Sequence, residues 1–285
     1  MSIRRLIRKD IDTEKWNRCV EQSTSPLIYG TTHYLDQVCP RWIGLVKGDY
    51  EAVMPVPLVL RKVLRVVGMP LFCQQLGVFS PQKITDFGPW LAKISKRPFS
   101  NSLSFNYFNP IEGEERVNLV VNLERPLEDI RSKFNQNTKR NIKKGAKLGL
   151  DFSDRVRFEQ FVALHRAEVA TRDKALTNKA YQTLRGLYEV LSKRGEAYIL
   201  GLHSQDQLVS TILFTQAFGR LIYLAAATRG EYKKSGANHL LVDQAIEHFH
   251  GQVSVLDFEG SSIPGIARFF RGFGAEEENY TLVKI

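Results

Sequence analysis

The last third of the chain, residues 197–285, carries the pattern that most constrains the fold. Three runs rich in β-forming residues come first and are separated by short polar turns, at residues 197–203, 208–216 and 220–228. A basic turn containing glycine then leads into a helical pattern, and a short apolar run follows at residues 253–258. This order predicts an antiparallel meander whose last strand, residues 221–228, is joined by a crossover helix to a parallel neighbour at residues 253–258.

The basic turn has the composition of an anion-binding site. It reads Lys233, Lys234, Ser235, Gly236, Ala237 and Asn238, and we call these six residues the lysine turn. Its backbone N–H groups and two ammonium groups would lie at the positive end of the following helix, which favours a phosphate. We therefore predict that the lysine turn binds a phosphate-containing cofactor or donor.

Two carboxylates follow the next strand. Asp257 and Glu259 fall at its predicted carboxyl end, where ligand sites open in folds of this kind, so we predict them as candidates to remove a proton from an attacking amine. The competing interpretation is structural. A carboxylate in this position can instead accept hydrogen bonds from the first amides of the next helix.

Positive charge is concentrated in one segment. The net charge is +10, and residues 125–157 hold ten cations against four anions, a contribution of +6. Such a segment attracts polyanions through long-range electrostatics, although a solvated helix face explains a basic run equally well. For the functional interpretation we predict substrate-binding roles for four residues, called here the basic strip: Lys139, Arg140, Lys143 and Lys144.

Two segments resemble the Fem-type peptidoglycan aminoacyltransferases of the N-acetyltransferase-like (GNAT) superfamily. One is residues 134–149, with its asparagines, basic pairs and glycines, and the other is residues 257–274. The resemblance implies an α+β protein of tandem acetyltransferase-like domains, each a mixed central sheet flanked by helices. It also implies an N-acyltransferase whose donor is acyl-coenzyme A or aminoacyl-tRNA. The usual coenzyme A loop has Arg or Gln at its first defining position, Gly at the second, and Gly or Ala at the third. The lysine turn has Lys233, Gly236 and Asn238 at these positions, so it departs from that loop at the first and the third.

The domain boundary is predicted near Glu124, because Pro126 followed by two acidic residues is a typical helix opening. We expect a degenerate first domain at residues 1–124, with a similar but reduced sheet, and a second at residues 125–285. His165 lies on an apolar helical stripe and is predicted to be a core residue rather than a catalytic base.

Other features restrict the chemistry. The three cysteines lack metal-ligand or disulfide spacing, and no nucleophile triad or metal cluster is recognisable, which favours direct transfer between bound substrates. No apolar run approaches about 18 residues, so we expect a cytoplasmic protein without a membrane span. A noncatalytic module that uses the same fold to recognise nucleic acid or a cell-wall precursor remains the alternative.

Overall fold

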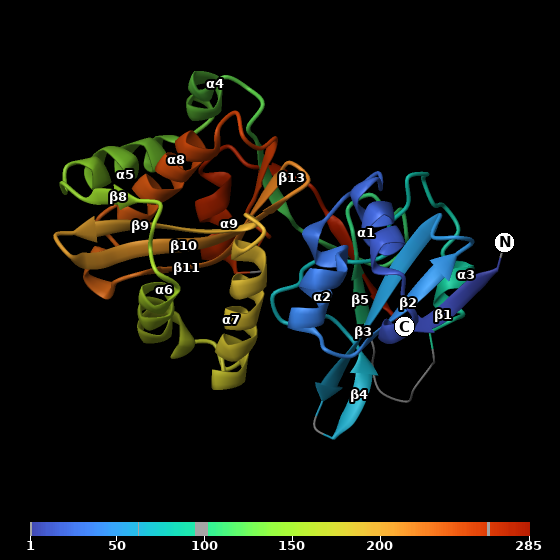
Figure 1. Ribbon diagram of the computed structural model, residues 1–285. Helices are drawn as coiled ribbons and strands as arrows, with labels where there is room; N and C mark the ends of the chain where they lie inside the picture. Colours follow the sequence, from blue (N-terminus) through green and yellow to red (C-terminus); the bar gives the residue numbers. More distant parts are fainter. Residues whose placement is uncertain (1, 62, 95–101, 261–262) are drawn as a thin grey trace. The chain divides into compact units, whose positions relative to one another are not determined.

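The computed structural model describes residues 2–61, 63–94, 102–260 and 263–285 (Figure 1). Its contacts divide the chain into two units, Met1–Arg116 with Asn279–Ile285, and Val117–Glu278. This division differs from the predicted 1–124 and 125–285. The boundary falls after Arg116 because the next strand pairs within the second unit, and the last seven residues return to the first.

Unit 1 is built on antiparallel strands. Four of them form one sheet in the order β1-β2-β3-β4: Ile3–Ile7, Trp42–Lys47, Ala52–Arg61 and Leu64–Val67. Three more form a second sheet in the order β5-β14-β6: Ser102–Phe105, Tyr280–Lys284 and Glu114–Arg116. The helices of this unit are α1 (Thr13–Glu21), α2 (Thr32–Val38) and α3 (Gly88–Leu91). The prediction that the first half of the chain carries its own sheet is confirmed.

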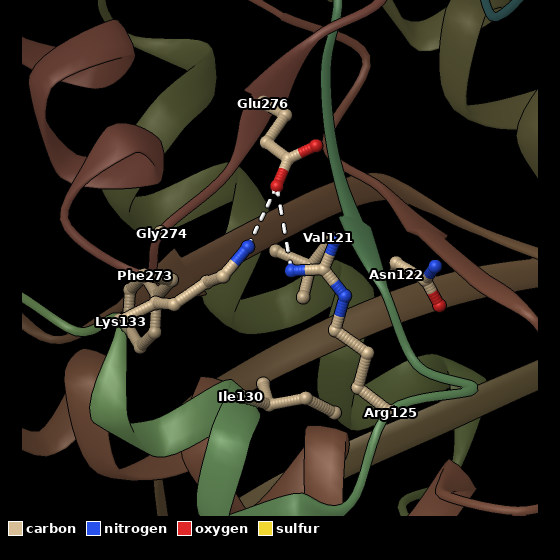
Figure 2. Close-up of a pocket in the computed structure, with 8 residues that line it drawn as sticks. All are labelled: Val121, Asn122, Arg125, Ile130, Lys133, Phe273, Gly274 and Glu276. Carbon is tan, nitrogen blue, oxygen red and sulfur yellow. Dashed lines mark hydrogen bonds and ion pairs between the residues drawn. The ribbon is translucent and has the colours of Figure 1, made fainter.

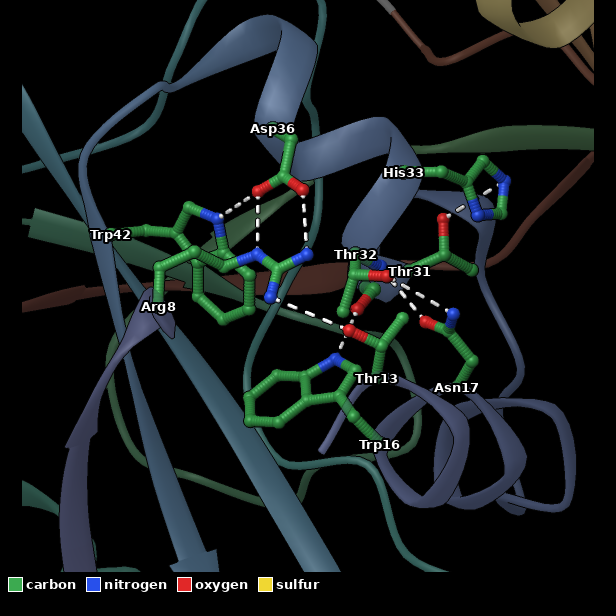
Figure 3. Close-up of polar contacts among 10 residues, drawn as sticks. Arg8, Thr13, Trp16, Asn17, Thr31, Thr32, His33, Asp36 and Trp42 are labelled. Atoms are coloured by element: carbon green, nitrogen blue, oxygen red, sulfur yellow. Dashed lines mark hydrogen bonds and ion pairs between the residues drawn. The ribbon is translucent and has the colours of Figure 1, made fainter. Parts of the chain in front are cut away.

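A polar cluster fixes α2 against the start of this sheet (Figure 3). The carboxylate of Asp36 on α2 accepts two hydrogen bonds from Arg8, each 2.8 Å long, and one of 2.9 Å from the indole of Trp42. The indole of Trp16 on α1 donates to the Gly30 carbonyl at 2.8 Å. Every polar atom named here has a protein partner, so we interpret the cluster as structural.

Unit 2 has one seven-stranded sheet in the order β13-β7-β12-β11-β10-β9-β8. The strands are, in that order, Glu276–Glu277, Leu119–Asn122, Val255–Asp257, Arg220–Thr228, Gln207–Ala217, Ala197–Ser204 and Asp151–Ser153. The meander β9-β10-β11 is antiparallel, and β11 and β12 are parallel neighbours. The helix α8 (Ala237–Phe249) connects them, which confirms the predicted crossover unit.

Helices cover both faces of this sheet (Figure 1). The helices α5 (Gln136–Ala146) and α8 pack together over one face, and α6 (Phe158–His165) and α7 (Asn178–Ser192) lie against the other. The unit also contains the helices α4 (Leu127–Ser132) and α9 (Pro264–Arg271). Under α8 lies a hydrophobic core, in which Leu200, Ile212 and Phe214 of the sheet cluster with Leu241 and Ile246 of the helix.

The chain returns to unit 1 after it has formed unit 2. In unit 2 the strand β7, which follows β6 of unit 1 along the chain, pairs between β12 and β13. In unit 1 the strand β14, which follows β13 of unit 2, pairs between β5 and β6. Both strands are antiparallel to their neighbours. The second sheet of unit 1 therefore depends on a strand that follows the whole of unit 2 in the sequence.

Candidate functional site

The strands β11 and β12 separate in the middle of unit 2. They pair only from Arg220 with Val255 to Ile222 with Asp257. Beyond that point the chain after β12 follows β7 instead, because the N–H of Phe258 donates to the carbonyl of Leu119 at 2.9 Å. In the parts of the chain that the structure describes, no strand pairs with this edge of β11 from Tyr223 onward. Its backbone groups are therefore available to a ligand.

A bulge lies at the same place. On its other side β11 pairs with β10, and the register shifts between Leu213 opposite Ala225 and Phe214 opposite Tyr223. Leu224 is consequently the extra residue in β11. A bulge bends its strand and redirects the backbone groups beside it, and bulges are common next to active sites. The bulge and the end of β12 pairing coincide within two residues.

Aromatic side chains fill the space behind the separated strands. The ring of Tyr223 lies 5.8 Å from that of Phe258 and 5.5 Å from that of Phe270 on α9, and the latter two rings stack at 4.4 Å. The side chain of Asn238 at the start of α8 hydrogen bonds to Tyr223, but burial dominates and raises the pKa of the tyrosine hydroxyl. The hydroxyl is thus neutral at ordinary pH. The packing role predicted for the phenylalanines around Phe270 agrees with these contacts.

Gly236 of the lysine turn is required for packing. It precedes α8 with φ of 92°, in the left-handed region that favours glycine. A Cβ atom on it would lie 2.1 Å from the carbonyl oxygen of Asn141 on α5. Gly145 lies one turn later on α5, and a Cβ atom on it would lie 2.7 Å from the carbonyl oxygen of Gly236, which is also too close. The two glycines let α5 pack directly on the start of α8.

The lysine turn is held by internal contacts. The ammonium of Lys233 makes a 2.6 Å ion pair with Glu168, and the carbonyl of Lys234 accepts a 2.6 Å hydrogen bond from Lys144. The hydroxyl of Ser235 donates to the Tyr232 carbonyl at 2.7 Å, and it accepts from the N–H of Ala237, whose side chain is buried. Phosphate binding by these residues stays a prediction, and a phosphate at Lys233 would lie beside the carboxylate of Glu168.

The basic strip lies on α5, beside the lysine turn. Lys144 joins the two directly through its hydrogen bond to Lys234. Lys139 is half-buried and donates to the carbonyl of Ser132 at 2.9 Å, while Arg140 and Lys143 are exposed. The structure therefore brings together two sets of cations that are about 90 residues apart in the sequence. Arg140 and Lys143 present their charge to solvent next to the turn.

Asp257 is part of a buried ion cluster. Its side chain is 0% exposed, and it accepts a 2.6 Å hydrogen bond from Arg220, which is itself 7% exposed and pairs with Glu278 at 2.9 Å. The N–H of Glu259 also donates to Asp257, at 2.7 Å. Burial raises the pKa of Glu278, and the positive charge of Arg220 opposes that rise. This environment favours the structural interpretation for Asp257, with Arg220 rather than helix amides as its main partner.

Glu259 follows in the turn after β12. It is half-buried and has φ of 57°, an uncommon backbone conformation for a residue other than glycine. The next residue, Gly260, could not carry a side chain, since a Cβ would lie 2.0 Å from the carbonyl oxygen of Val117. The turn is thus fixed tightly against the approach to β7. A role for Glu259 as a proton acceptor at the end of β12 stays a prediction.

Two histidines of unit 2, His165 and His239, are explained by packing. His165 is buried, with its Nδ1 atom 2.7 Å from the hydroxyl of Tyr181, and desolvation lowers its pKa to about 4. His239 on α8 meets the ring of Phe269 edge-on at 4.8 Å, and desolvation lowers its pKa as well. Both imidazoles are neutral at pH 7. The core environment predicted for His165 agrees with this geometry.

A small cavity beside β7 does not offer a substrate site (Figure 2). Its volume is about 10 Å³, which is enough for about one water molecule. The two cations that line it, Arg125 and Lys133, both point to the carboxylate of Glu276, at 3.6 and 2.8 Å. The positive charges there are already compensated within the protein.

In unit 1 a short segment connects the two sheets. Residues 76–79 make this connection, since Val53 bridges Phe79 and Leu76 bridges Phe105 in parallel. The side-chain amide of Asn109 takes both backbone hydrogen bonds of Val78, accepting at 2.8 Å and donating at 3.1 Å. The backbone groups of Val78 are therefore satisfied within the protein.

Sequence reasoning missed two residues that organise this site. Glu168 lies in a π-helical turn, Arg166–Ala170, that continues α6, and no periodic pattern marks it. Arg220 is the first residue of the strand β11. A charged residue at the start of an apolar run is the signal in the sequence that could have identified it. Among the described residues no three His, Cys, Asp or Glu side chains gather as metal ligands, and no described helix is long and apolar enough to cross a membrane.

Comparisons with known proteins agree with this geometry. Residues 132–271 match a family model described as an acetyltransferase (GNAT) domain. A crystal structure of FemX is 11% identical and aligns over 98% of this chain and 96% of its own, with a TM-score of 0.70. A tandem GNAT protein from the clavulanic acid biosynthesis pathway is 11% identical over 99% of this chain and 98% of its own, with a TM-score of 0.56.

A third structure is the C-terminal domain of a putative lysylphosphatidylglycerol synthetase from Agrobacterium fabrum. It is 8% identical over 96% of this chain and 91% of its own, with a TM-score of 0.56. No curated protein matches the sequence. At these identities the structural likeness establishes the fold, and the predicted tandem acetyltransferase-like architecture is confirmed.

Proposed function

We propose that this chain, a Fem-like protein with a tandem GNAT fold, is an N-acyltransferase that moves an acyl or aminoacyl group onto an amine. The observation that carries the proposal is the open edge of β11 from Tyr223 onward, beside the start of α8. Exposed backbone N–H groups can orient a carbonyl and stabilise the charge that develops on its oxygen during transfer. The donor is assigned to unit 2, because both the open edge and the start of α8 lie there.

Two donor classes fit the surroundings of this edge. Acyl-coenzyme A would place its phosphates at the lysine turn, and aminoacyl-tRNA would also use the exposed cations of α5, Arg140 and Lys143. The similarity to FemX and to a lysylphosphatidylglycerol synthetase supports acyl transfer by this fold, without fixing the donor or the acceptor. We propose Glu259 as the residue that accepts the proton of the attacking amine.

A transfer assay tests the function. Purified protein is incubated with each donor class, labelled in the acyl group, and with a panel of primary amines that includes peptidoglycan precursor peptides and aminoacyl lipids. We expect an N-acylated product from one donor class. Binding of precursor or nucleic acid without any transfer, under conditions in which the protein is folded, would instead support a noncatalytic recognition module.

The salt dependence of binding tells the two donors apart. Each phosphate neutralised by a cation releases counterions, so the logarithm of tRNA affinity should fall with the logarithm of salt concentration by somewhat under one unit per contact. The double charge reversal Arg140→Glu with Lys143→Glu should therefore flatten the tRNA slope by about 1.5 units. Coenzyme A should show a much shallower dependence on salt.

The matched control reverses two exposed lysines, Lys179 on α7 and Lys193 directly after it, which changes the net charge equally but lies away from α5. We expect its tRNA slope to equal that of the unmodified protein. Equal slopes for both double variants would show that the basic strip does not contact tRNA.

A further inference from the structure

The carboxylate of Glu168 binds Lys233 of the lysine turn and the backbone just before that turn. One of its oxygens accepts a 2.9 Å hydrogen bond from the backbone N–H of Gly230, and the other accepts a 2.6 Å hydrogen bond from Lys233. The Glu168 side chain is 19% exposed and that of Lys233 is 34% exposed, so the ion pair is partly open to solvent. Glu168 thereby binds two residues of the loop between β11 and α8 and holds that loop in place.

The chemistry of this contact is that of an anion site. A backbone N–H together with an ammonium group is a set of donors that binds phosphate oxygens, and a carboxylate offers the same acceptors with one negative charge. The positive charges of Lys233 and, more weakly, Arg172 lower the pKa of Glu168, so it is ionised at neutral pH. A phosphate that approaches Lys233 therefore meets a charge of its own sign.

We propose that Glu168 is a specificity-determining residue of the donor site, which disfavours donors that must place a diphosphate at Lys233. The proposal rests on the proposed function, since it takes the loop before α8 as the donor site. A donor that carries its phosphates past the exposed Arg140 and Lys143 leaves the Glu168 contact intact. A coenzyme A thioester that places its diphosphate at Lys233 lies beside the Glu168 carboxylate, and repulsion between these negative charges lowers its affinity.

The alternative is that Glu168 merely anchors the loop, and Glu168→Gln separates the two. The amide oxygen of Gln still accepts from Gly230, which preserves the anchor, while the negative charge beside Lys233 is removed. We expect Glu168→Gln to bind coenzyme A about fivefold more tightly than the unmodified protein, the size of a partly exposed ion pair. Adding Lys233→Ala to this variant should abolish the gain.

Coenzyme A binding is measured by titration calorimetry, with the melting temperature of each variant as a check that the loop stays folded. The control is Glu159→Gln, which removes a carboxylate from an exposed ion pair with Arg185 on the same face of the sheet. Its coenzyme A affinity should equal that of the unmodified protein.

Three outcomes overturn the proposal: an unchanged affinity in Glu168→Gln, a weaker one, or no coenzyme A binding by any variant. The transfer assay reports separately on the proposed function. If the unmodified protein transfers an acyl group but Glu168→Gln gains nothing, the function stands and the role of Glu168 fails. If Glu168→Gln binds coenzyme A more tightly but no donor supports transfer, the effect of Glu168 on coenzyme A binding stands and the proposed function fails.

Discussion

Glu259→Gln should reduce turnover by about 10²- to 10⁴-fold, the contribution expected of a general base, while the dissociation constant of the donor stays unchanged. The substitution keeps the size of the side chain and the N–H of residue 259, which donates to Asp257. Single-turnover kinetics beside donor titration measure both quantities. Because the variant removes only the acceptor of the amine proton, its turnover should recover partly as pH rises and the amine loses that proton to solvent.

The matched control for this experiment is Glu231→Gln, an exposed carboxylate in the short helix before the lysine turn. Its turnover should be normal. Asp257→Asn should behave differently from both, with a lower melting temperature and weaker donor binding together, as befits a buried structural carboxylate. Normal turnover in Glu259→Gln would assign proton removal to solvent or to the substrate itself.

Arg220→Met should lower the free energy of unfolding by about 3–5 kcal/mol, the second large effect that we expect. The substitution leaves the buried carboxylate of Asp257 and the largely buried one of Glu278 without their cation. Chemical denaturation of both proteins at pH 7 measures the difference. A matched surface variant, Arg271→Met, removes an ion pair with Glu277 whose side chains are both nearly half exposed, and should cost less than about 1 kcal/mol.

The loss of unfolding free energy in Arg220→Met should depend on pH in a definite direction. Burial already raises the pKa of Glu278 in the folded protein, and loss of Arg220 removes the influence that opposes this rise. A carboxyl group whose folded pKa is raised stabilises the fold below its unfolded pKa, and that contribution is lost as pH rises through the folded pKa. The destabilisation should therefore be largest near neutral pH and shrink as the solution is acidified. A loss that is independent of pH would contradict the buried cluster as its cause.

The meander, the crossover helix and the parallel pairing of β11 with β12 follow from local signals in the sequence. Each depends on periodicity within a run of residues or on a turn between adjacent runs, such as Gly219 between β10 and β11. The same holds for the helix that begins at Ala237, since Gly236 marks its start. The fold class can be predicted from local patterns of this kind, because they do not depend on partners that are distant in the sequence.

The contacts that define the candidate site could not be predicted from local sequence patterns. Glu168 meets Lys233 across 65 residues, and Arg220 meets Asp257 across 37. Nothing in the neighbourhood of either acidic residue indicates a partner at such a distance. The lysine turn was correctly recognised as a helix start, but the sequence did not reveal that one of its two ammonium groups is already neutralised. The domain boundary was misplaced for a similar reason, because β7 finds its neighbours among residues more than 130 positions later.

The place of β14 in the sequence bears on how the polypeptide acquires its structure during synthesis. Domains generally fold in order as they leave the ribosome, the N-terminal one first. Here β5 and β6 of the first unit must wait for β14, which follows the whole of unit 2 in the sequence. Pairings across such long stretches are slow to form. The nascent first unit therefore emerges with two unpaired strand edges, and they find their partner only after unit 2 has been translated.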